Sequence, residues 1–397
     1  MKNKIIKANI YEIDAGWRNW FYLEIISKNG LKGYSEIAES NGPKSSLPKI
    51  TFDLLSKVDL TQLQNINTIK RQLNSFNKQG LGGTVSKCIA AINNALVDIA
   101  SKNYDLSAVD FLGGSLRNEV PTYWSHCATT RIRSLNFLGP KTNQVSNLND
   151  FKILGKEVTD SGFKSLKTNL ISLEPISVIM PSYNSQDILN TQNIETVVTD
   201  TKNIINNLKN NNKNQVLLDV GYNLSNSSLL TLLKELNQLD LGWIEIDFDN
   251  FENIKELKES ISTPICSGEN NVSFFQYFHL INSKIAEIIS VDPSWNSVQD
   301  ILQVSKYANF HNQEITLHNH YSNLSTYIGL SISKLIENFS YLEVDYDDVS
   351  WKDELISLPD LENGKFQHTS ELPGWGFQIN WDVLNDKLIN SSSISLG

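Results

Sequence analysis

Three acidic residues in the second half of the chain each follow a short apolar run, and their spacing is nearly even. They are Asp219, Glu245 and Glu269, separated by 26 and 24 residues, which is close to the length of one strand–helix unit. Carboxylates are rarely buried unless they are paired or bind a metal. Three of them at equivalent strand ends would converge on the rim of a parallel barrel. Because all three donors are oxygens, the set predicts a site for a divalent cation, with Mg²⁺ the best match.

Further polar residues follow the apolar runs on either side of this trio. Lys167 and Asn169 are two residues apart and therefore face the same side of a strand. Asp292, His318 and His320 follow later runs. A carboxylate and an imidazole beside a metal site suit acid–base chemistry. The sequence therefore predicts one site assembled from several strand ends.

The elements that carry these residues alternate between strand and helix after Gly114. Helical stretches such as 223–237 and 297–310 lie between most of the apolar runs. Eight strands in this alternation favour a closed parallel barrel over an open sheet. The expected strands are Val120–Trp124, Ser165–Thr168, Val216–Asp219, Gly242–Ile246, Pro264–Ser267, Ile288–Asp292, Glu314–His318 and Phe339–Val344.

The beginning of the chain has a different pattern. An apolar stripe over Val85–Ala100 predicts a helix. Three stretches with strand character precede it and predict an antiparallel meander: Ile5–Ile13, Phe21–Ser27 and Leu31–Ile37. We therefore expect three parts: an α+β domain at residues 1–115, a barrel at 116–356, and a C-terminal segment at 357–397 that returns to the first domain.

Composition excludes several classes of protein. The 397 residues carry a formal net charge of −10, and no basic stripe is visible, which argues against a nucleic-acid partner. No apolar run is long enough for a transmembrane helix or a signal peptide. Three cysteines lie far apart, which argues against a disulfide framework or a zinc site and suits a reducing cytoplasm. We expect a cytoplasmic protein that acts on a small molecule and binds neither nucleic acid nor membrane.

An ordered set of motifs along nearly the whole chain resembles the enolase superfamily, in its mandelate racemase and muconate lactonizing enzyme-like branch. The motifs are Ala90–Ile99 followed by Phe111–Gly114, Gly162–Lys167, Leu218-Asp219, Trp243–Glu245, Pro264–Glu269 and Pro373–Gly376. The resemblance implies an α/β fold, a modified (β/α)7β TIM-type barrel with an N-terminal α+β capping domain. It also implies a homo-oligomer.

The resemblance also implies a chemistry. Mg²⁺ on Asp219, Glu245 and Glu269 would bind the carboxylate of a substrate, and a base would remove the proton α to that carboxylate. The resulting enediolate gains negative charge that must be neutralised electrostatically.

Two residues are similar to the Asp–His dyad of the branch. The carboxylate of Asp292 would orient His318 and raise the basicity of its imidazole. His320 lies on the same strand face and is an alternative base. Lys167 corresponds to a lysine that contacts the substrate carboxylate. Glu343 matches an acid that hydrogen-bonds the enediolate, and it is equally explained as part of a solvated acidic stretch.

Other residues near the expected rim suit a polyhydroxylated acid. The expected substrate-binding residues are Asn169, His320, His126 and Trp17. Trp20 is expected to pack between domains, and Trp17 either to pack there or to shield the site from water. Arg131 and Arg133 are expected to be solvated surface residues.

Asn169 is the departure that decides the predicted reaction. The branch commonly carries Lys-x-Lys on the second strand, whereas this chain reads Lys167-Thr168-Asn169, so the second base is missing. Racemisation generally needs a base on each face, and a single base suits elimination. We predict a lyase that dehydrates an acid sugar, an aldonate or aldarate, to a 2-keto-3-deoxy acid. The alternatives are an isomerase (epimerase, racemase or cycloisomerase) and a barrel that has lost catalysis and serves as a ligand-binding or scaffold protein.

Overall fold

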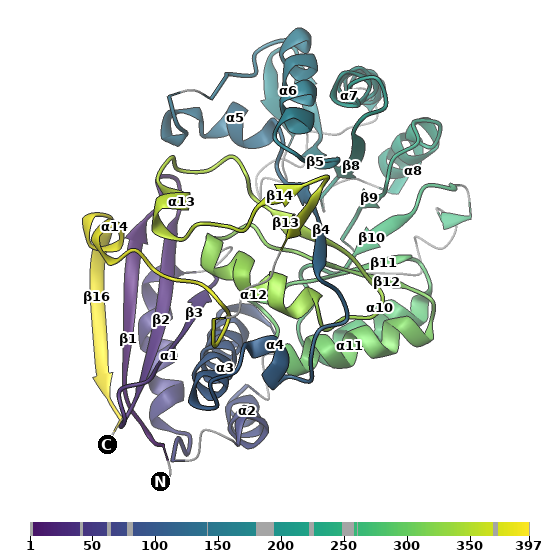
Figure 1. The fold of residues 1–397 in the computed structure, drawn as a ribbon. Helices are drawn as coiled ribbons and strands as arrows, with labels where there is room; N and C mark the ends of the chain where they lie inside the picture. The colour runs from purple at the N-terminus through teal and green to yellow at the C-terminus, as the bar shows by residue number, and fades with distance from the viewer. Residues whose placement is uncertain are drawn as a thin grey trace.

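The fold joins an antiparallel sheet, formed near the two ends of the chain, to a closed parallel barrel (Figure 1). The structure is a computed structural model. It describes residues 3–39, 43–61, 65–77, 82–140, 142–179, 194–221, 226–247, 258–259, 261–367 and 372–396.

The antiparallel sheet has the strand order β16-β1-β2-β3. Its strands are β1 (Ile5–Asp14), β2 (Asn19–Ser27), β3 (Lys32–Ile37) and β16 (Leu388–Ser395). The three N-terminal strands confirm the predicted meander. The last strand pairs with the first, so the end of the chain lies at the edge of this sheet.

One long helix covers this sheet. The helix α3 (Gly83–Asn103) contains the predicted stretch 85–100, and most of its residues are buried. Gly33 of β3 approaches the helix so closely that a Cβ there would lie 2.4 Å from the carbonyl oxygen of Ala95. The shorter helices of this region are α1 (Leu47–Ser56), α2 (Ile66–Ser75) and α4 (Ala108–Phe111), with a 3₁₀ turn at Lys44–Ser46.

The barrel closes because its last strand pairs in parallel with its first. All eight predicted strands are present, which confirms the predicted fold class, although four of them are shorter than expected. They are β4 (Glu119–Trp124), β5 (Ser165–Asn169), β8 (Gln215–Asp219), β9 (Ile244–Glu245), β10 (Ile265–Ser267), β11 (Ile288–Val291), β12 (Glu314–Leu317) and β13 (Phe339–Val344).

Helices surround the barrel on the outside. They are α5 (Thr129–Arg133), α6 (Leu148–Asp160), α7 (Ile194–Leu208), α8 (Asn226–Leu236), α10 (Ser273–Ser283), α11 (Val298–Phe310) and α12 (Asn323–Ser333). The minor elements are a 3₁₀ turn at Leu135–Phe137, β6 (Ile171–Leu173), β7 (Ile176–Val178), α13 (Lys352–Leu355), β14 (Leu361–Glu362), β15 (Lys365–Gln367) and α14 (Trp381–Asp386). Within the described residues, no helix is long and apolar enough to cross a membrane.

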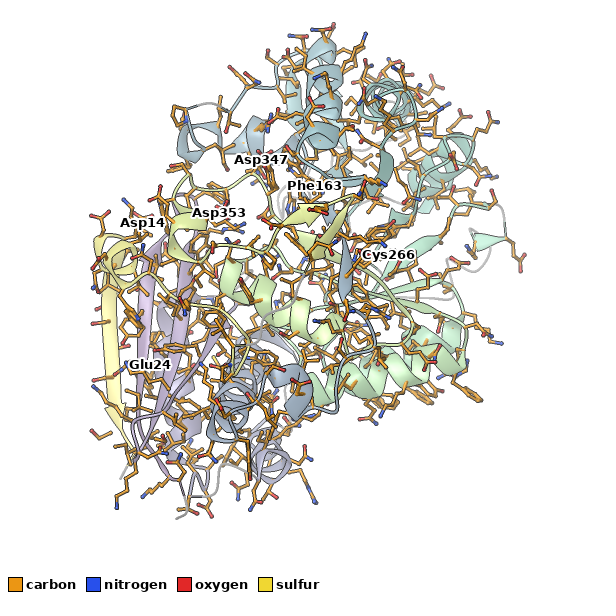
Figure 2. The ribbon with its side chains drawn as sticks, viewed as in Figure 1. Asp14, Glu24, Phe163, Cys266, Asp347 and Asp353 are labelled. Atoms are coloured by element: carbon orange, nitrogen blue, oxygen red, sulfur yellow. The ribbon has the colours of Figure 1, made fainter. Side chains whose placement is uncertain are left out.

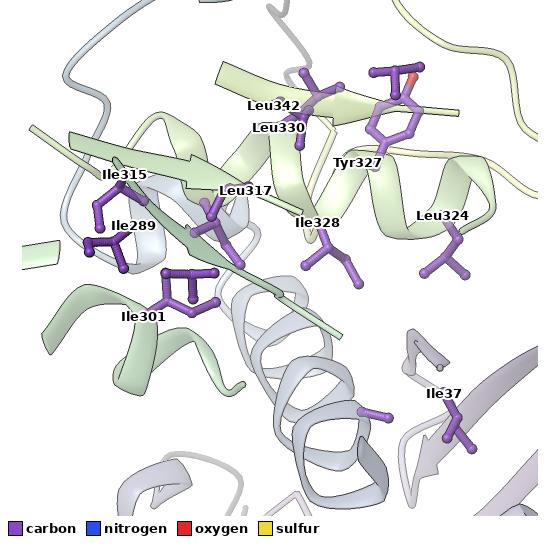
Figure 3. Close-up of a cluster of buried hydrophobic side chains, with 14 of the residues drawn as sticks. Ile37, Ile289, Ile301, Ile315, Leu317, Leu324, Tyr327, Ile328, Leu330 and Leu342 are labelled. Atoms are coloured by element: carbon purple, nitrogen blue, oxygen red, sulfur yellow. The ribbon is translucent and has the colours of Figure 1, made fainter. Parts of the chain in front are cut away.

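The helix α12 joins the two parts of the molecule. Every one of its residues is buried, because it lies between the barrel and the N-terminal domain. On the barrel side it contacts β13, and on the other side it contacts β3. Figure 3 shows Leu324 and Ile328 of this helix facing toward Ile37, with Leu330 near Leu342. Apolar packing on both faces therefore fixes the position of the segment that precedes α12, which carries His318 and His320.

Candidate active site

The predicted site residues collect at the carboxyl ends of the barrel strands. Strand register places three of them side by side: Asn169 is opposite Asp219, and Asp219 is opposite Glu245. The remaining rim residues sit at or just past the ends of later strands, and they are Glu269, Asp292, His318 and Glu343. Parallel strands end on one side of the barrel, so residues distant in sequence share one small region.

Lys167 is the buried cation of this region. Its Nζ lies 2.8 Å from Oε2 of Glu245 and 3.1 Å from Oε1 of Glu343. Burial disfavours the charged ammonium, but the two carboxylates outweigh this and raise the pKa of Lys167. The lysine therefore stays protonated and neutralises part of the charge at the rim.

The carboxyl group of Glu343 is completely buried. The hydroxyl of Ser125 donates to its Oε1, and the backbone N–H of Asn319 donates to its Oε2 at 2.9 Å. Burial opposes ionisation, but the positive charges of Lys167 and His318 hold the pKa of Glu343 well below its usual range. Asp345, like its neighbours Asp347 and Asp348, is also buried, so the interpretation of this stretch as solvated acid is wrong.

The three candidate metal ligands differ in their surroundings. Asp219 accepts hydrogen bonds from the amide of Asn169 at 2.9 Å and from the backbone of Gly221 at 2.9 Å. Glu245 is paired with Lys167, and Glu269 lies 3.4 Å from Nε2 of His318. In this arrangement, no group of three or more His, Cys, Asp or Glu side chains among the described residues could hold a metal ion.

The chemistry of the carboxylates nevertheless fits a hard divalent cation. Burial raises the pKa of Glu245, and the charge of Asp219 adds to the effect against the opposing Lys167. Burial also raises the pKa of Glu269, with Asp247 and Glu245 contributing in the same direction against His318. Such crowding of oxygen donors leaves negative charge that the protein itself does not fully neutralise.

Asp292 and His318 form a hydrogen-bonded pair. Nδ1 of His318 lies 2.8 Å from Oδ2 of Asp292, and the same oxygen accepts from the Tyr321 hydroxyl at 2.7 Å. The backbone N–H of Ser294 donates to Oδ1 of Asp292 at 2.6 Å. Nε2 of His318 points to the rim, 3.8 Å from Oε2 of Glu343. Burial lowers the pKa of His318, but Glu269, with Glu343 and Asp292, raises it to about 10 overall.

His320 takes a different position from His318. Its Nδ1 lies 3.0 Å from Nε2 of His318. The histidine that Asp292 bonds is His318, as predicted, and not His320. Burial and the charge of His318 lower the pKa of His320 well below its usual range. The ring of His126 lies 6.0 Å from that of His320, and its Nδ1 is 3.3 Å from Asp345. Three imidazoles thus line one side of the rim.

Asn169 is held by protein partners on both sides of its amide. Its oxygen accepts from the Thr129 hydroxyl at 2.8 Å, and its nitrogen donates to Asp219. A carboxamide at this position cannot take up a proton at working pH.

Arg18 lies in the loop between β1 and β2, and its contacts with the histidine segment were not predicted from the sequence. Its guanidinium is 3.1 Å from Asp345 and also bonds Asp348 and the backbone oxygen of His320. It therefore ties the loop between β1 and β2 to the histidine segment. Its flanking tryptophans, Trp17 and Trp20, are packed: Trp17 against Phe137 at 6.0 Å, and the buried Trp20 edge-on to Trp351 at 5.3 Å.

Arg131 contradicts the prediction that it is solvated. Its side chain is 2% exposed and forms two bonds of 2.7 Å to Glu157, as well as bonds of 2.9 and 3.0 Å to Asp347, a residue shown in Figure 2. Arg133 is exposed as expected. The sequence gives no signal for this difference because the partners lie on other elements.

The comparisons with known proteins agree with this geometry. A family model described as Enolase C-terminal domain-like matches residues 153–383. A curated relative, D-xylonate dehydratase from Haloferax volcanii, is 21% identical over 389 residues, which cover 94% of this chain and 87% of the relative.

Two solved structures show how far the similarity extends. A proposed L-alanine-DL-glutamate epimerase from Burkholderia xenovorans strain LB400, bound to magnesium and fumarate, is 27% identical with a TM-score of 0.90 and covers 97% of this chain and 96% of that chain. A proposed dehydratase from Mesorhizobium loti is 19% identical with a TM-score of 0.82 and covers 98% and 100%. The latter likeness shows the fold alone.

Replacing Arg131 with Met should destabilise the protein by about 3–5 kcal/mol, because it leaves the buried Asp347 without its cation. The measurement is urea unfolding. The control is Lys156→Met, which removes an exposed ion pair with Asp160 and should cost less than ~1 kcal/mol. Equal losses for the two variants would contradict the assignment of Arg131 as a buried structural cation.

Proposed function

The chain belongs to the enolase superfamily, and we propose that it is a lyase that removes the proton α to a carboxylate and dehydrates an acid sugar. The product is a 2-keto-3-deoxy acid. One observation carries the proposal: the Asp292–His318 pair presents Nε2 to the carboxylate rim, while residue 169, where the branch commonly carries a second lysine, is an asparagine whose amide bonds Asp219. The relative named D-xylonate dehydratase supports the same reaction class.

We propose that Asp219, Glu245 and Glu269 hold Mg²⁺ beside the substrate. Their oxygen-only donors and unneutralised charge support this assignment. The chemistry that the ion supplies when bound is neutralisation of the charge that develops on the substrate carboxylate. Lys167 lies between Glu245 and Glu343 and is placed to contribute a second positive charge at the same carboxylate.

The remaining steps belong to the side chains. His318 accepts the proton from C2 on Nε2 in its neutral form, which becomes accessible once the charge of Glu269, the largest cause that raises its pKa, is neutralised. Asp292 keeps the other ring nitrogen protonated and oriented. The electron pair from the broken C2–H bond moves onto the substrate carboxylate and gives an enediolate. It then forms a C2–C3 double bond as the C3–O bond breaks. The leaving hydroxide takes up the proton from the His318 imidazolium and departs as water. The resulting enol then tautomerises to the keto acid, so atoms and charge balance.

We propose that residues around the Asp292–His318 pair orient the substrate. Asn169, His126, His320 and Trp17 are the proposed substrate-binding residues. Glu343 is held by Ser125 and Asn319, so its position beside Lys167 is fixed, and we propose that it hydrogen-bonds the enediolate. Arg18 is a positioning residue, because it donates to the backbone oxygen of His320 and so holds the histidine segment in place.

Asp292→Asn should lower kcat by about 10²–10⁴-fold, because an amide neither stabilises the imidazolium nor fixes the tautomer of His318. The assay screens purified protein with Mg²⁺ against aldonic and aldaric acids and reads the 2-keto product. Asp386→Asn, at a surface residue paired with Lys387, is the matched control and should retain activity. If no acid in the library is turned over by the wild type, the dehydratase proposal fails.

Glu245→Gln should weaken Mg²⁺ binding by on the order of 30-fold or more, because it removes one charged ligand from the set. Calorimetry with Mg²⁺ alone measures the affinity, and the rise in melting temperature on adding Mg²⁺ gives an independent readout. Glu235→Gln on the exposed side of α8 is the control. Wild-type protein that binds no Mg²⁺ would instead support a scaffold without catalysis.

The rival reaction is epimerisation, favoured by the 27% identity to the Burkholderia protein. Turnover in D₂O separates the two. Dehydration gives a keto product with deuterium at C3, and recovered substrate keeps its configuration at C2 because Asn169 supplies no base on the second face. Deuterated substrate of inverted configuration with no keto product would establish an isomerase.

A further inference from the structure

Asp292 receives a second side-chain donor besides His318. The hydroxyl of Tyr321 donates to Oδ2 of Asp292 at 2.7 Å, and this is the same oxygen that lies 2.8 Å from Nδ1 of His318. The indole N–H of Trp295 in turn donates to the Tyr321 hydroxyl at 2.6 Å. Asp292, Trp295 and Tyr321 are all buried, so water has little access to these bonds. The proposed reaction gives neither Tyr321 nor Trp295 a role.

The direction of each hydrogen bond in this chain of donors is fixed by the groups themselves. An indole nitrogen can only donate a hydrogen bond, and an ionised carboxylate can only accept one. The Tyr321 hydroxyl has a single proton, and because its oxygen accepts from Trp295, that proton is committed to Asp292. His318 therefore shares the Asp292 oxygen with a donor whose direction cannot reverse while Trp295 is in place.

We propose that Tyr321 is a positioning residue for the Asp292–His318 pair, and that Trp295 fixes the direction of its hydroxyl. This inference rests on the proposed function in one respect, which is that His318 is the base. The backbone N–H of Ser294 holds Oδ1 of Asp292 at 2.6 Å, and Tyr321 holds Oδ2, so the carboxylate does not rotate away from the imidazole. The oxygen that orients Nδ1 of His318 therefore stays in place while Nε2 takes up the proton of the substrate.

The N-terminal domain holds Trp295 in the orientation that this role requires. Nζ of Lys87, on the helix α3, lies 4.1 Å from the centroid of the Trp295 ring. A cation over the face of an indole is attracted by the ring, so Lys87 stabilises the position from which the indole donates to Tyr321. Ala38, just past β3, belongs to the same buried apolar cluster as Trp295 and Tyr321. The geometry of the base therefore depends on contacts from both parts of the molecule.

The first test compares kcat with KM in Tyr321→Phe, which keeps the ring and removes only the hydroxyl. The variant should lower kcat by about 10–100-fold, as expected when one hydrogen bond to a charged group is lost, and should leave KM within about twofold. Tyr327→Phe is the matched control, because it removes another hydroxyl, which donates to the backbone oxygen of Ser357 at 2.9 Å, and it should retain kcat. An unchanged kcat in Tyr321→Phe, a loss confined to KM, or equal losses in the two variants overturns the proposal.

A double variant tests the order of the chain of donors. Trp295→Phe removes the indole N–H, so kcat should fall, but by less than in Tyr321→Phe. The double variant Tyr321→Phe/Trp295→Phe should be no slower than Tyr321→Phe alone, because Trp295 acts only through the Tyr321 hydroxyl. Losses that multiply in the double variant would overturn the assignment of Trp295.

A measurement without substrate separates this inference from the proposed function. In protein carrying isotope-labelled histidine, the NMR resonance of the proton on Nδ1 of His318 reports its bond to Asp292, and His318→Asn assigns that resonance. The resonance should shift in Tyr321→Phe and not in Tyr327→Phe, because only the first variant changes the carboxylate that the proton faces. An unshifted resonance overturns the role of Tyr321 even if the wild type dehydrates acid sugars. If the wild type turns over no acid, the dehydratase proposal fails, and the shift still decides whether Tyr321 positions the pair.

Discussion

The concentration of negative charge at one end of the barrel is the constraint on which the site depends. Strand register alone brings Asp219 beside Glu245, and Glu269, Asp292 and Glu343 follow on the later strand ends. Buried carboxylates are costly unless they are neutralised. Lys167 and His318 neutralise part of the charge from within the protein. The rest favours a divalent cation, and so the same residues that would destabilise an ordinary core define the candidate active site.

The N-terminal domain contributes to this site by fixing the histidine segment. Arg18 bonds the backbone of His320. Glu36 accepts the backbone N–H and the hydroxyl of Ser322, and Tyr22 donates to that same hydroxyl at 2.8 Å. Ser322 also caps α12. The segment from His318 to α12 is therefore held by hydrogen bonds from one domain and by apolar packing from both, which keeps the imidazoles in one geometry.

Periodic features of the sequence were sufficient to predict the barrel and the residues on its rim. A strand end followed by a carboxylate is a local pattern, and its repetition at even spacing made Asp219, Glu245 and Glu269 recognisable as a set. The buried roles of Arg18 and Arg131 depend on partners more than 200 residues away, such as Asp348 and Asp347, and nothing near either arginine in sequence indicates them. The contacts of the Pro293–Asn296 loop were equally unpredictable from the sequence. Trp295 donates to the hydroxyl of Tyr321 at 2.6 Å, and only the fold brings these two residues together.

The choice between elimination and isomerisation depends on what occupies the face opposite His318. A lysine in place of Asn169 would supply a base, but it would also add a positive charge next to Asp219. The amide instead links Thr129 to Asp219 without changing the charge of the rim. These two hydrogen bonds hold the Asn169 side chain in a fixed position next to Asp219. In the proposed function, Asn169 leaves His318 as the one base, which favours a reaction that needs proton transfer at one face of C2 over a two-base inversion.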